Sequence, residues 1–262
     1  MNILTAINEA SEVLKKNHIK SPKLDSEILL SKIIKKDRKY IILNSNKELK
    51  NNYFIMFNKL IAKRSLGKPV AYLIGKKDFW KYEFYVSEET LIPRPDTEIL
   101  IDHILKTTKY KSKLRVVDIG VGSGCIILSI LKEKKDFYGT GIDINNKCIE
   151  ISKINASKLN LTSRVKFFKS NVDNFLYGKY DLIISNPPYI RHLDLKYLDK
   201  EVIDFEPKIA LDGGLEGISE IRKVIERSSE LIKKKGKIVL EIGFDQKHKV
   251  KKLLKDKGFY IS

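Results

Sequence analysis

One short stretch in the middle of the chain constrains the fold more than any other. Residues 114–118, with the apolar Leu114, Val116 and Val117, predict a buried strand, and the glycines after it alternate with other residues as Gly-x-Gly-x-Gly. An apolar run that begins at Cys125 predicts a helix, and a second apolar strand, 138–142, ends in Asp143. Strand, glycine turn, helix and strand in this order are typical of a parallel sheet covered by helices.

The glycine turn predicts a binding site as well as a fold. Glycines between a strand and a helix allow positive φ angles and a close approach of the backbone to a ligand. The first N–H groups of the helix point to the same place. We therefore expect a cofactor to be lined by Gly120, Val121, Gly122, Ser123 and Gly124. The spacing differs from the Gly-x-Gly-x-x-Gly of dinucleotide-binding proteins.

Two carboxylates flank this turn. Asp143 ends the second strand about twenty residues past the glycines, where an acidic side chain is suited to bind ribose hydroxyls. Asp118 comes just before the glycines, and two interpretations of it are equally supported: it bonds to loop amides, or it faces a cationic cofactor. The turn and Asp143 together predict a nucleoside cofactor.

The tetrapeptide Asn186-Pro187-Pro188-Tyr189 follows an apolar run, 180–185, that predicts another strand. It brings a side-chain amide, prolyl carbonyls and an aromatic ring to one point, a set suited to holding a flat NH2 group during electrophilic attack. For the tetrapeptide alone, a Pro-rich turn is an equally good interpretation. Because ligands of parallel sheets bind at the carboxyl ends of strands, we expect Asn186 and the glycine turn to share one cleft.

The chain divides into three regions. Apolar residues recur at helical spacing through residues 1–75 and predict a small all-α domain. Aromatic residues at strand-like spacing predict a β-hairpin linker at 76–90. Residues 91–262 alternate between strand and helix, which predicts an α/β domain with a Rossmann-like sheet and helices on both faces. After a helix near 94–107, strands are expected near 114–118, 138–142, 165–168, 180–185 and 237–242.

Nothing in the composition indicates a membrane protein. No apolar stretch reaches the eighteen or so residues that cross a bilayer, and the first residues lack the layout of a secretory signal. Cys125 and Cys148 lie in apolar helical patterns without metal-ligand spacing, so we expect core thiols. A reduced, cytoplasmic protein is the expectation.

The formal net charge of +18 is compatible with nucleic-acid binding. However, the basic residues are 43 Lys and only 8 Arg, and the chain is also rich in Ile and Asn. This bias is typical of drift towards AT-rich codons, and we favour that interpretation over selection for bidentate phosphate contacts. We therefore expect no direct requirement for nucleic acid, although a basic protein associates readily with ribosomes or RNA.

Further motifs extend over nearly the whole chain. They are Arg64-x-x-Gly67-x-Pro69-x-x-Tyr72-x-x-Gly75, Leu91-Ile92-Pro93-Arg94-Pro95-Asp96-Thr97-Glu98, Glu206-Pro207-x-x-Ala210-Leu211-x-Gly213-Gly214 and Glu241-Ile242-Gly243-x-x-Gln246. With the glycine turn and the tetrapeptide, they make the chain resemble the class I S-adenosylmethionine-dependent methyltransferases. Within these it closely resembles the HemK-type glutamine methyltransferases that modify peptide chain release factors. The tetrapeptide is shared with DNA adenine methyltransferases, whereas the first two motifs are more particular to the glutamine enzymes.

The resemblance implies a cofactor site. S-adenosyl-L-methionine is expected to contact the turn from Gly120 to Gly124, Asp143 through its ribose, and Asn186. Asn171 and Val172 fall where the family often has an acidic residue and an aromatic one beside the adenine. The adenine contacts there are therefore expected to be weaker or made by the backbone. Family members usually run on for a further strand, so the resemblance implies a shortened end.

The resemblance also implies catalytic and substrate-binding residues. Asn186 and the carbonyl of Pro187 accept hydrogen bonds from the substrate amide, Pro188 shapes the turn, and Tyr189 packs on the amide plane. An amide nitrogen is a poor nucleophile, so two acceptors on its hydrogens would stabilise the positive charge that develops during methyl transfer. This chemistry needs neither a metal nor a general base, and none of the four histidines lies in a motif.

Arg94, Asp96 and Glu98 have two possible tasks. They form a structural lid that ties a helix start to the sheet over the cleft, which we favour, or they line the mouth of the site. Asp96 and Glu98 suit a first helical turn because of the helix dipole. Glu206-Pro207 and Gly213-Gly214 are expected to form a loop beside the target amide.

Four functions are compatible with the sequence. The resemblance implies methylation of the glutamine side-chain nitrogen, N5, in the Gly-Gly-Gln motif of peptide chain release factors. The alternatives are glutamine methylation of a ribosomal protein, adenine N6-methylation of nucleic acid, and a non-catalytic RNA- or ribosome-binding module. Adenine methylation predicts a base-recognition domain, for which the small helical region is a poor candidate. The non-catalytic alternative predicts that the cofactor motif and the amide-binding tetrapeptide have decayed, yet both are intact.

Overall fold

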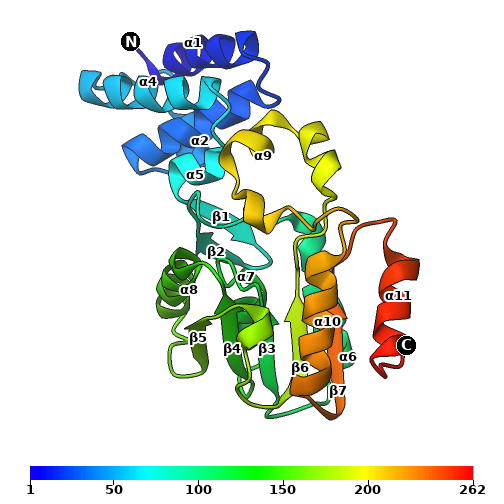
Figure 1. The fold of residues 1–262 in the computed structure, drawn as a ribbon. Helices are drawn as coiled ribbons and strands as arrows, with labels where there is room; N and C mark the ends of the chain where they lie inside the picture. The colour runs from blue at the N-terminus through cyan, green and yellow to red at the C-terminus, as the bar shows by residue number, and fades with distance from the viewer. Residues whose placement is uncertain (262) are drawn as a thin grey trace. The chain divides into compact units, whose positions relative to one another are not determined.

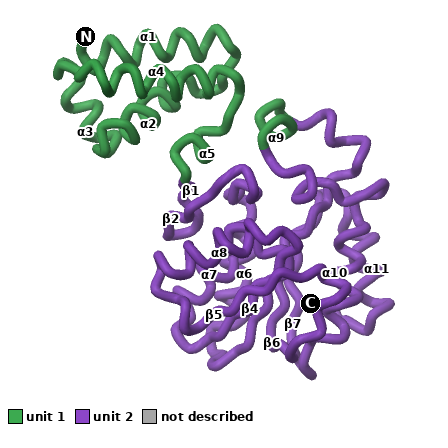
Figure 2. Tube along the Cα trace, turned by 60° about the vertical axis from the view of Figure 1, so that its left-hand side comes forward, with its two compact units in different colours: residues 1–75, 199–205 green, residues 76–198, 206–262 purple. Residues whose placement is uncertain are grey.

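The computed structural model describes residues 1–261, which form two compact units (Figures 1 and 2). The helical unit contains residues 1–75 together with 199–205, and the α/β unit contains the other described residues. The hairpin predicted as a linker at 76–90 belongs to the α/β unit by its contacts. The sequence did not indicate that residues 199–205, from within the predicted 91–262 domain, pack with the helical unit.

Amphipathic helices build the helical unit. Asn2 precedes the first helix and caps it, because its side chain accepts a hydrogen bond from the N–H of Thr5. Leu14, Leu29 and Phe57 are fully buried where three of the helices meet. The elements are α1 (Ile3–Lys16), α2 (Pro22–Ile34), α3 (Arg38–Leu43), α4 (Asn51–Ser65), α5 (Val70–Ile74) and α9 (Lys200–Phe205).

A buried arginine ties α9 to this unit. Arg64, at the end of α4, donates through Nε to Asp25 at 2.7 Å and through Nη2 to Glu201 of α9 at 2.6 Å. Its Nη1 also donates to the carbonyls of Gly67 and Lys68. The guanidinium is therefore paired on every side, as a buried charge requires. This network gives the Arg-x-x-Gly-x-Pro motif a structural task.

The α/β unit is organised around five parallel strands in the order β5-β4-β3-β6-β7. Four of them lie within a residue of the predicted positions: β3 (Arg115–Ile119), β4 (Tyr138–Asp143), β5 (Val165–Lys169) and β6 (Tyr180–Ser185). The fifth, β7 (Ile232–Leu240), begins earlier than the predicted 237–242. It takes in a run of lysines because the register with β6 shifts between Tyr180 and Leu182.

Helices cover both faces of this sheet, which confirms the predicted fold class (Figure 1). Val116 and Leu182 face one core, whereas their neighbours Val117 and Ile183 face the other, as alternation along a strand requires. Three helices cover the first core, α10 covers the second, and α11 packs on α10. The helices are α6 (Glu98–Thr107), α7 (Cys125–Glu133), α8 (Asn146–Lys158), α10 (Ser219–Leu231) and α11 (Lys247–Asp256).

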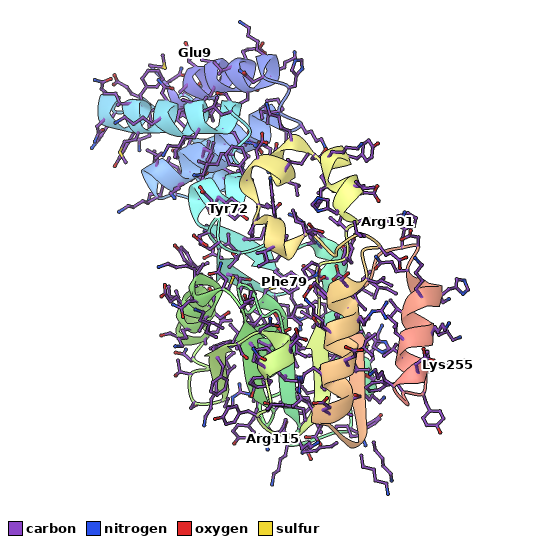
Figure 3. The ribbon with its side chains drawn as sticks, viewed as in Figure 1. Glu9, Tyr72, Phe79, Arg115, Arg191 and Lys255 are labelled. Atoms are coloured by element: carbon purple, nitrogen blue, oxygen red, sulfur yellow. The ribbon has the colours of Figure 1, made fainter. Side chains whose placement is uncertain are left out.

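The predicted hairpin is present and joins the first core. Its strands pair antiparallel, and Phe79 packs edge-on against Phe84 with ring centroids 6.1 Å apart. Figure 3 places Phe79 inside the unit, whereas Lys255 on α11 is exposed. No helix within residues 1–261 is both long and apolar enough to cross a bilayer. The remaining elements are β1 (Lys76–Phe79), β2 (Tyr82–Tyr85), η1 (Pro95–Thr97), η2 (Val172–Asn174), η3 (His192–Tyr197) and η4 (Lys208–Ala210).

Candidate active site

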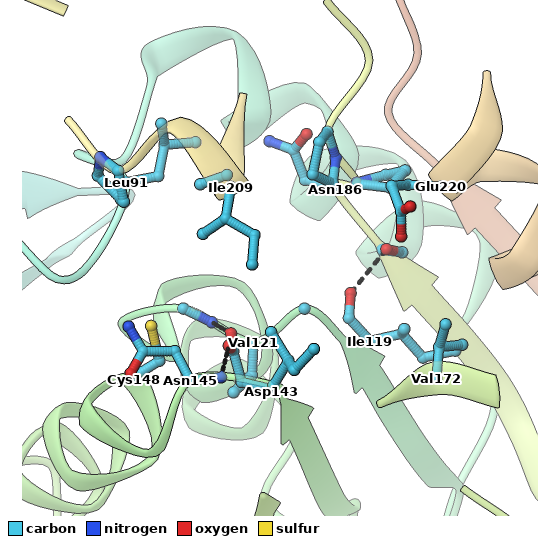
Figure 4. A pocket seen from close by; sticks show the side chains of 18 of the residues that line it. Leu91, Ile119, Val121, Asp143, Asn145, Cys148, Val172, Asn186, Ile209 and Glu220 are labelled. Atoms are coloured by element: carbon cyan, nitrogen blue, oxygen red, sulfur yellow. Dashed lines mark hydrogen bonds between the residues drawn. The ribbon is translucent and has the colours of Figure 1, made fainter. Parts of the chain in front are cut away.

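The carboxyl ends of β3, β4 and β6 open into one cavity of ≈ 630 Å³. This is the edge at which parallel α/β sheets bind ligands, and the volume suits a small molecule. All lining residues come from the α/β unit. Figure 4 shows one side of the cavity formed by Val121, Asp143, Asn145 and Val172, and the other by Leu91, Asn186, Ile209 and Glu220.

The glycine turn forms part of the cavity wall with its backbone. Gly120 and Gly122 have φ angles of 76° and 53°, and an added Cβ at either residue would meet no atom within 4 Å. The space in front of them is therefore open to a ligand. Val121 and Ser123 also line the cavity, whereas Gly124 does not. An added Cβ at Gly124 would lie 2.9 Å from the side chain of Leu128, so this glycine allows close packing at the start of α7.

Asp143 closes the turn from the neighbouring strand. One carboxylate oxygen accepts the N–H of Gly122 at 2.9 Å, and the other accepts the N–H of Asn145 at 2.9 Å. Burial raises the pKa of Asp143 above its usual value, and these N–H groups act in the opposite direction. Each carboxylate oxygen has two lone pairs, so each retains the capacity to accept a further hydrogen bond from a ligand.

Asp118 lies buried at the end of β3 and does not line the cavity. Neither of its carboxylate oxygens has a hydrogen bond of ordinary geometry to any part of the described chain. Burial raises its pKa well above the usual value, although the N–H of Ile127 acts in the other direction. Of the two interpretations from the sequence, bonding to the loop amides is therefore not observed.

Asn171 and Val172 line the cavity beyond β5. The Asn171 side chain accepts the N–H of Asp173 at 3.2 Å, which caps the short helix η2. The carbonyl of Val172 accepts Nε of Arg227, from α10, at 3.1 Å. The turn is therefore held by hydrogen bonds to its backbone, with the apolar Val172 side chain beside the open space.

The tetrapeptide presents three of its four residues to the cavity. Asn186, Pro187 and Pro188 line it, and Nδ2 of Asn186 donates to Oγ1 of Thr97 at 3.2 Å. Tyr189 does not line the cavity, although the sequence led us to expect its ring on the amide plane. Its ring packs instead against the apolar cluster of α10 and α11, and its hydroxyl donates to Glu241 at 3.4 Å.

The loop from Glu206 to Gly214 forms another part of the wall. Buried Glu206 accepts the N–H of Ile92 at 3.1 Å and pairs with Arg94. Residues 207–210 line the cavity next to it. Backbone hydrogen bonds join Ile190, which follows the tetrapeptide, to Leu211 and Gly213 at 3.1 and 2.8 Å. This loop therefore lies beside Asn186.

The three charged residues near the start of α6 separate in the structure. Arg94 lines the cavity. Glu98 accepts the N–H of Trp80 at 2.8 Å and so fixes the hairpin. Asp96 is exposed outside the cavity wall. Glu98 therefore fits the structural interpretation, and Arg94 fits the interpretation that these residues line the mouth of the site.

Several residues at the cavity had no assigned role in the sequence interpretation. Thr97 lies under Asn186, and Ile209 projects from the loop. Glu220 and Lys223 reach the cavity from α10 and pair at 2.7 Å. The only signal for Thr97 was its place in the motif that ends at Glu98. The α10 pair lies outside every motif.

Comparisons with known proteins agree with this geometry. Residues 5–75 match the family described as PrmC N-terminal domain, and residues 95–206 match the methyltransferase small domain. A solved ribosomal protein L11 methylase from Lactobacillus delbrueckii subsp. bulgaricus superposes with a TM-score of 0.50 at 18% identity. The superposition covers 68% of this chain and 76% of that one, and it supports the fold alone.

Two curated relatives match almost from end to end. A release factor glutamine methyltransferase of Buchnera aphidicola subsp. Schizaphis graminum is 38% identical over 99% of this chain and 93% of that protein. A second, of Clostridium acetobutylicum, is 38% identical over 99% of this chain and 92% of that protein. The chain therefore belongs to the release factor glutamine methyltransferase family.

Proposed function

We propose that this methyltransferase transfers a methyl group from S-adenosyl-L-methionine to the side-chain nitrogen, N5, of the glutamine in the Gly-Gly-Gln motif of peptide chain release factors. The relatives' names support a release factor as the substrate. The observation that carries the proposal is the position of Asn186. Its side chain lines the same cavity as the glycine turn and Asp143, and its NH2 group is already bonded to Thr97.

The residues of the cavity fit S-adenosyl-L-methionine. The open space at Gly120 and Gly122 accommodates a ligand against the backbone, and Asp143 retains acceptor capacity for ribose hydroxyls. Asp118 is buried beneath the same turn without a hydrogen bond of ordinary geometry from residues 1–261, so a cationic ligand above it would favour its ionised form. When bound, S-adenosyl-L-methionine supplies a methyl group whose bond to a positively charged sulfur breaks with its electron pair left on sulfur.

At the other end, the chain prepares the glutamine amide. Oδ1 of Asn186 accepts one hydrogen of the amide, and the carbonyl of Pro187 accepts the other. These acceptors hold the NH2 group in place and stabilise the positive charge that develops on nitrogen as its lone pair forms the new bond to carbon. One amide proton then leaves to water. Preorganised partners of this kind contribute about 3–4 kcal/mol each to the transition state.

A methylation assay tests this assignment. The purified protein is incubated separately with a release factor, a ribosomal protein preparation and nucleic acid, and the products are mapped by peptide mass spectrometry. We expect one added methyl group on the glutamine of Gly-Gly-Gln. Methylation of a ribosomal glutamine or of adenine, with an unmodified release factor, would overturn the proposal in favour of the corresponding alternative.

We also propose that residues 1–75 dock the protein substrate. The match to the PrmC N-terminal domain supports this role, as does the fact that the cavity is lined without this unit. Deleting residues 1–75 should leave cofactor binding and slow methylation of a short glutamine peptide, while methylation of the whole release factor falls sharply. An unchanged rate on the whole release factor would rule out docking. Because Glu201 loses Arg64 in this truncation, a Glu201→Gln version serves as the control for folding.

A further inference from the structure

Asn186 must present its carbonyl oxygen, and not its NH2 group, to a substrate amide. If the side-chain amide were rotated by 180°, the NH2 group of Asn186 would face the NH2 group of the substrate, and neither could accept a hydrogen bond. In the structure, Nδ2 donates to Oγ1 of Thr97 at 3.2 Å, so Oδ1 is the end of the amide that is not bonded to Thr97. Thr97 is only 3% exposed and lies in the last position of η1. Its hydroxyl is therefore a fixed partner that water does not replace.

A carboxylate lies next to this pair. Glu241 directly follows β7, and its Oε1 accepts the hydroxyl of Tyr189 at 3.4 Å. Its Oε2 is buried and has no hydrogen bond of ordinary geometry from residues 1–261. Burial raises the pKa of Glu241, while the side chains of Thr97, Tyr189 and Asn186 each act to lower it. The N–H of Glu241 also donates to the carbonyl of Ser185 at 3.0 Å, which places Glu241 beside the start of the tetrapeptide.

We infer that Thr97 and Glu241 form a relay that orients and polarises Asn186 for methyl transfer. In this relay Thr97 accepts Nδ2–H of Asn186, as observed, and its own hydroxyl proton is directed to the unpaired Oε2 of Glu241. Oδ1 of Asn186 is then left for the target amide. The inference rests on the proposed function, and it makes Thr97 and Glu241 positioning residues, because neither needs to touch the substrate.

The relay has a chemical consequence beyond orientation. When an amide donates from its nitrogen, electron density moves onto its oxygen, so Oδ1 becomes a better acceptor. Hydrogen bonds in a chain strengthen one another in this way, particularly where water is excluded. A buried carboxylate at the end of the chain also favours the positive charge that develops on the substrate nitrogen. The relay therefore acts on turnover more than on substrate binding.

Matched threonine variants test the relay. Thr97→Val keeps the shape of the side chain and removes the acceptor, and Thr97→Ser restores it. Thr108 is the control, because it is also 3% exposed and its hydroxyl donates to Ile104 at the end of α6. We expect Thr97→Val to lower kcat about tenfold, the value of one hydrogen bond, with an unchanged KM for the cofactor. Thr97→Ser should recover most of the rate, and Thr108→Val should keep it.

Glu241→Gln separates charge from hydrogen bonding. The amide retains an acceptor for Thr97 but loses the negative charge, so we expect a smaller fall in kcat than for Thr97→Val. Wild-type kcat in both Thr97→Val and Glu241→Gln would overturn the relay. A loss in Thr97→Val that Thr97→Ser does not recover would also overturn it, because that pattern indicates packing rather than the hydroxyl.

A measurement without substrate distinguishes failure of the relay from failure of the proposed function. The side-chain NH2 signals of Asn186 are identified by nuclear magnetic resonance through their loss in Asn186→Ala. We expect one of the two protons to exchange slowly with water, and Thr97→Val to abolish that protection while Thr108→Val preserves it. Unprotected protons in the wild-type protein would overturn the relay. Protected protons in an enzyme that leaves release factor unmodified would overturn the proposed substrate alone.

Discussion

The two ends of the cavity are built in different ways. At the cofactor end, segments 21–22 positions apart meet mostly through the backbone: the N–H groups of Gly120 and Val121 bond to the carbonyl of Ile142, and that of Gly122 bonds to the side chain of Asp143. At the amide end, side chains meet from segments far apart in the chain, as Thr97 meets Asn186 across 89 positions. One end depends mostly on local chain geometry, and the other on individual side chains.

This difference separates binding from turnover. Substitutions at the cofactor end should change affinity for the methyl donor, because they alter the surface on which it lies. Substitutions at the amide end should change kcat, because they alter only the groups that prepare the nitrogen. Each experiment below tests that division.

Asn186→Ala is expected to have the largest effect. It removes an acceptor that stabilises developing charge, so kcat should fall by about 10²–10³-fold. Cofactor affinity should stay within a factor of about three, since the glycine turn and Asp143 are intact. Single-turnover kinetics and calorimetry measure the two quantities. Asn186→Asp keeps an acceptor but loses the bond to Thr97, and we expect a large loss of kcat there too. If both variants turn over like the wild type, the tetrapeptide is only a turn.

Asp143→Ala should act in the opposite way. The ribose loses a charged acceptor, and hydrogen bonds to a charged group are worth about 1.5–3 kcal/mol, or roughly 10–150-fold in affinity. Calorimetry measures the affinity, and kcat at saturating cofactor should change much less. Asp102→Ala, on the outer side of α6, is the control for loss of a carboxylate. Unchanged affinity in Asp143→Ala would remove this residue from the cofactor site.

Gln246→Leu tests how the tetrapeptide is held. The buried Gln246 donates to the carbonyls of Tyr189 and Gly217 at 2.8 and 2.9 Å and accepts the N–H of Gly243 at 2.9 Å. Leaving these groups unpaired should cost about 1–3 kcal/mol of unfolding free energy and lower kcat severalfold. Urea denaturation and steady-state kinetics measure both. Reduced stability at wild-type kcat would show that the loop keeps its geometry without this side chain.

Asp118→Asn should have the smallest effect, which is a change in stability that depends on pH. Because burial raises the pKa of Asp118, the folded protein holds a proton that the unfolded chain releases, so stability falls as pH rises between the two pKa values. The amide removes this penalty, and we expect a gain of about 1 kcal/mol near neutral pH, shrinking as the solution is acidified. Thermal melts at several pH values measure it.

The same variant decides the remaining interpretation of Asp118. If its charge favours a cationic ligand, Asp118→Asn should weaken binding of S-adenosyl-L-methionine more than binding of the neutral thioether product. Equal effects on both ligands would assign Asp118 to packing beneath the turn.

Much of the fold was predictable because its signals are local. Apolar runs placed β3, β4, β5 and β6 to within a residue, and the helical spacing of residues 1–75 predicted an all-α region. Two features were not predictable. The start of β7 depends on a register shift against β6. The packing of residues 199–205 with the helical unit depends on the ion pair between Glu201 and Arg64, which are 137 positions apart.

The sequence by itself determined the sheet, the glycine turn, Asp143 at the neighbouring strand end and the position of Asn186 at the same edge. Each of these follows from short-range pattern and from the rule that parallel strands end together. Only the tertiary structure decided which way Asn186 faces, that Tyr189 lies outside the cavity, and that Thr97 and Glu241 stand behind the tetrapeptide. Those outcomes depend on which side chains meet across distant segments. Buried polar groups need hydrogen-bond partners, and the whole fold determines where those partners lie.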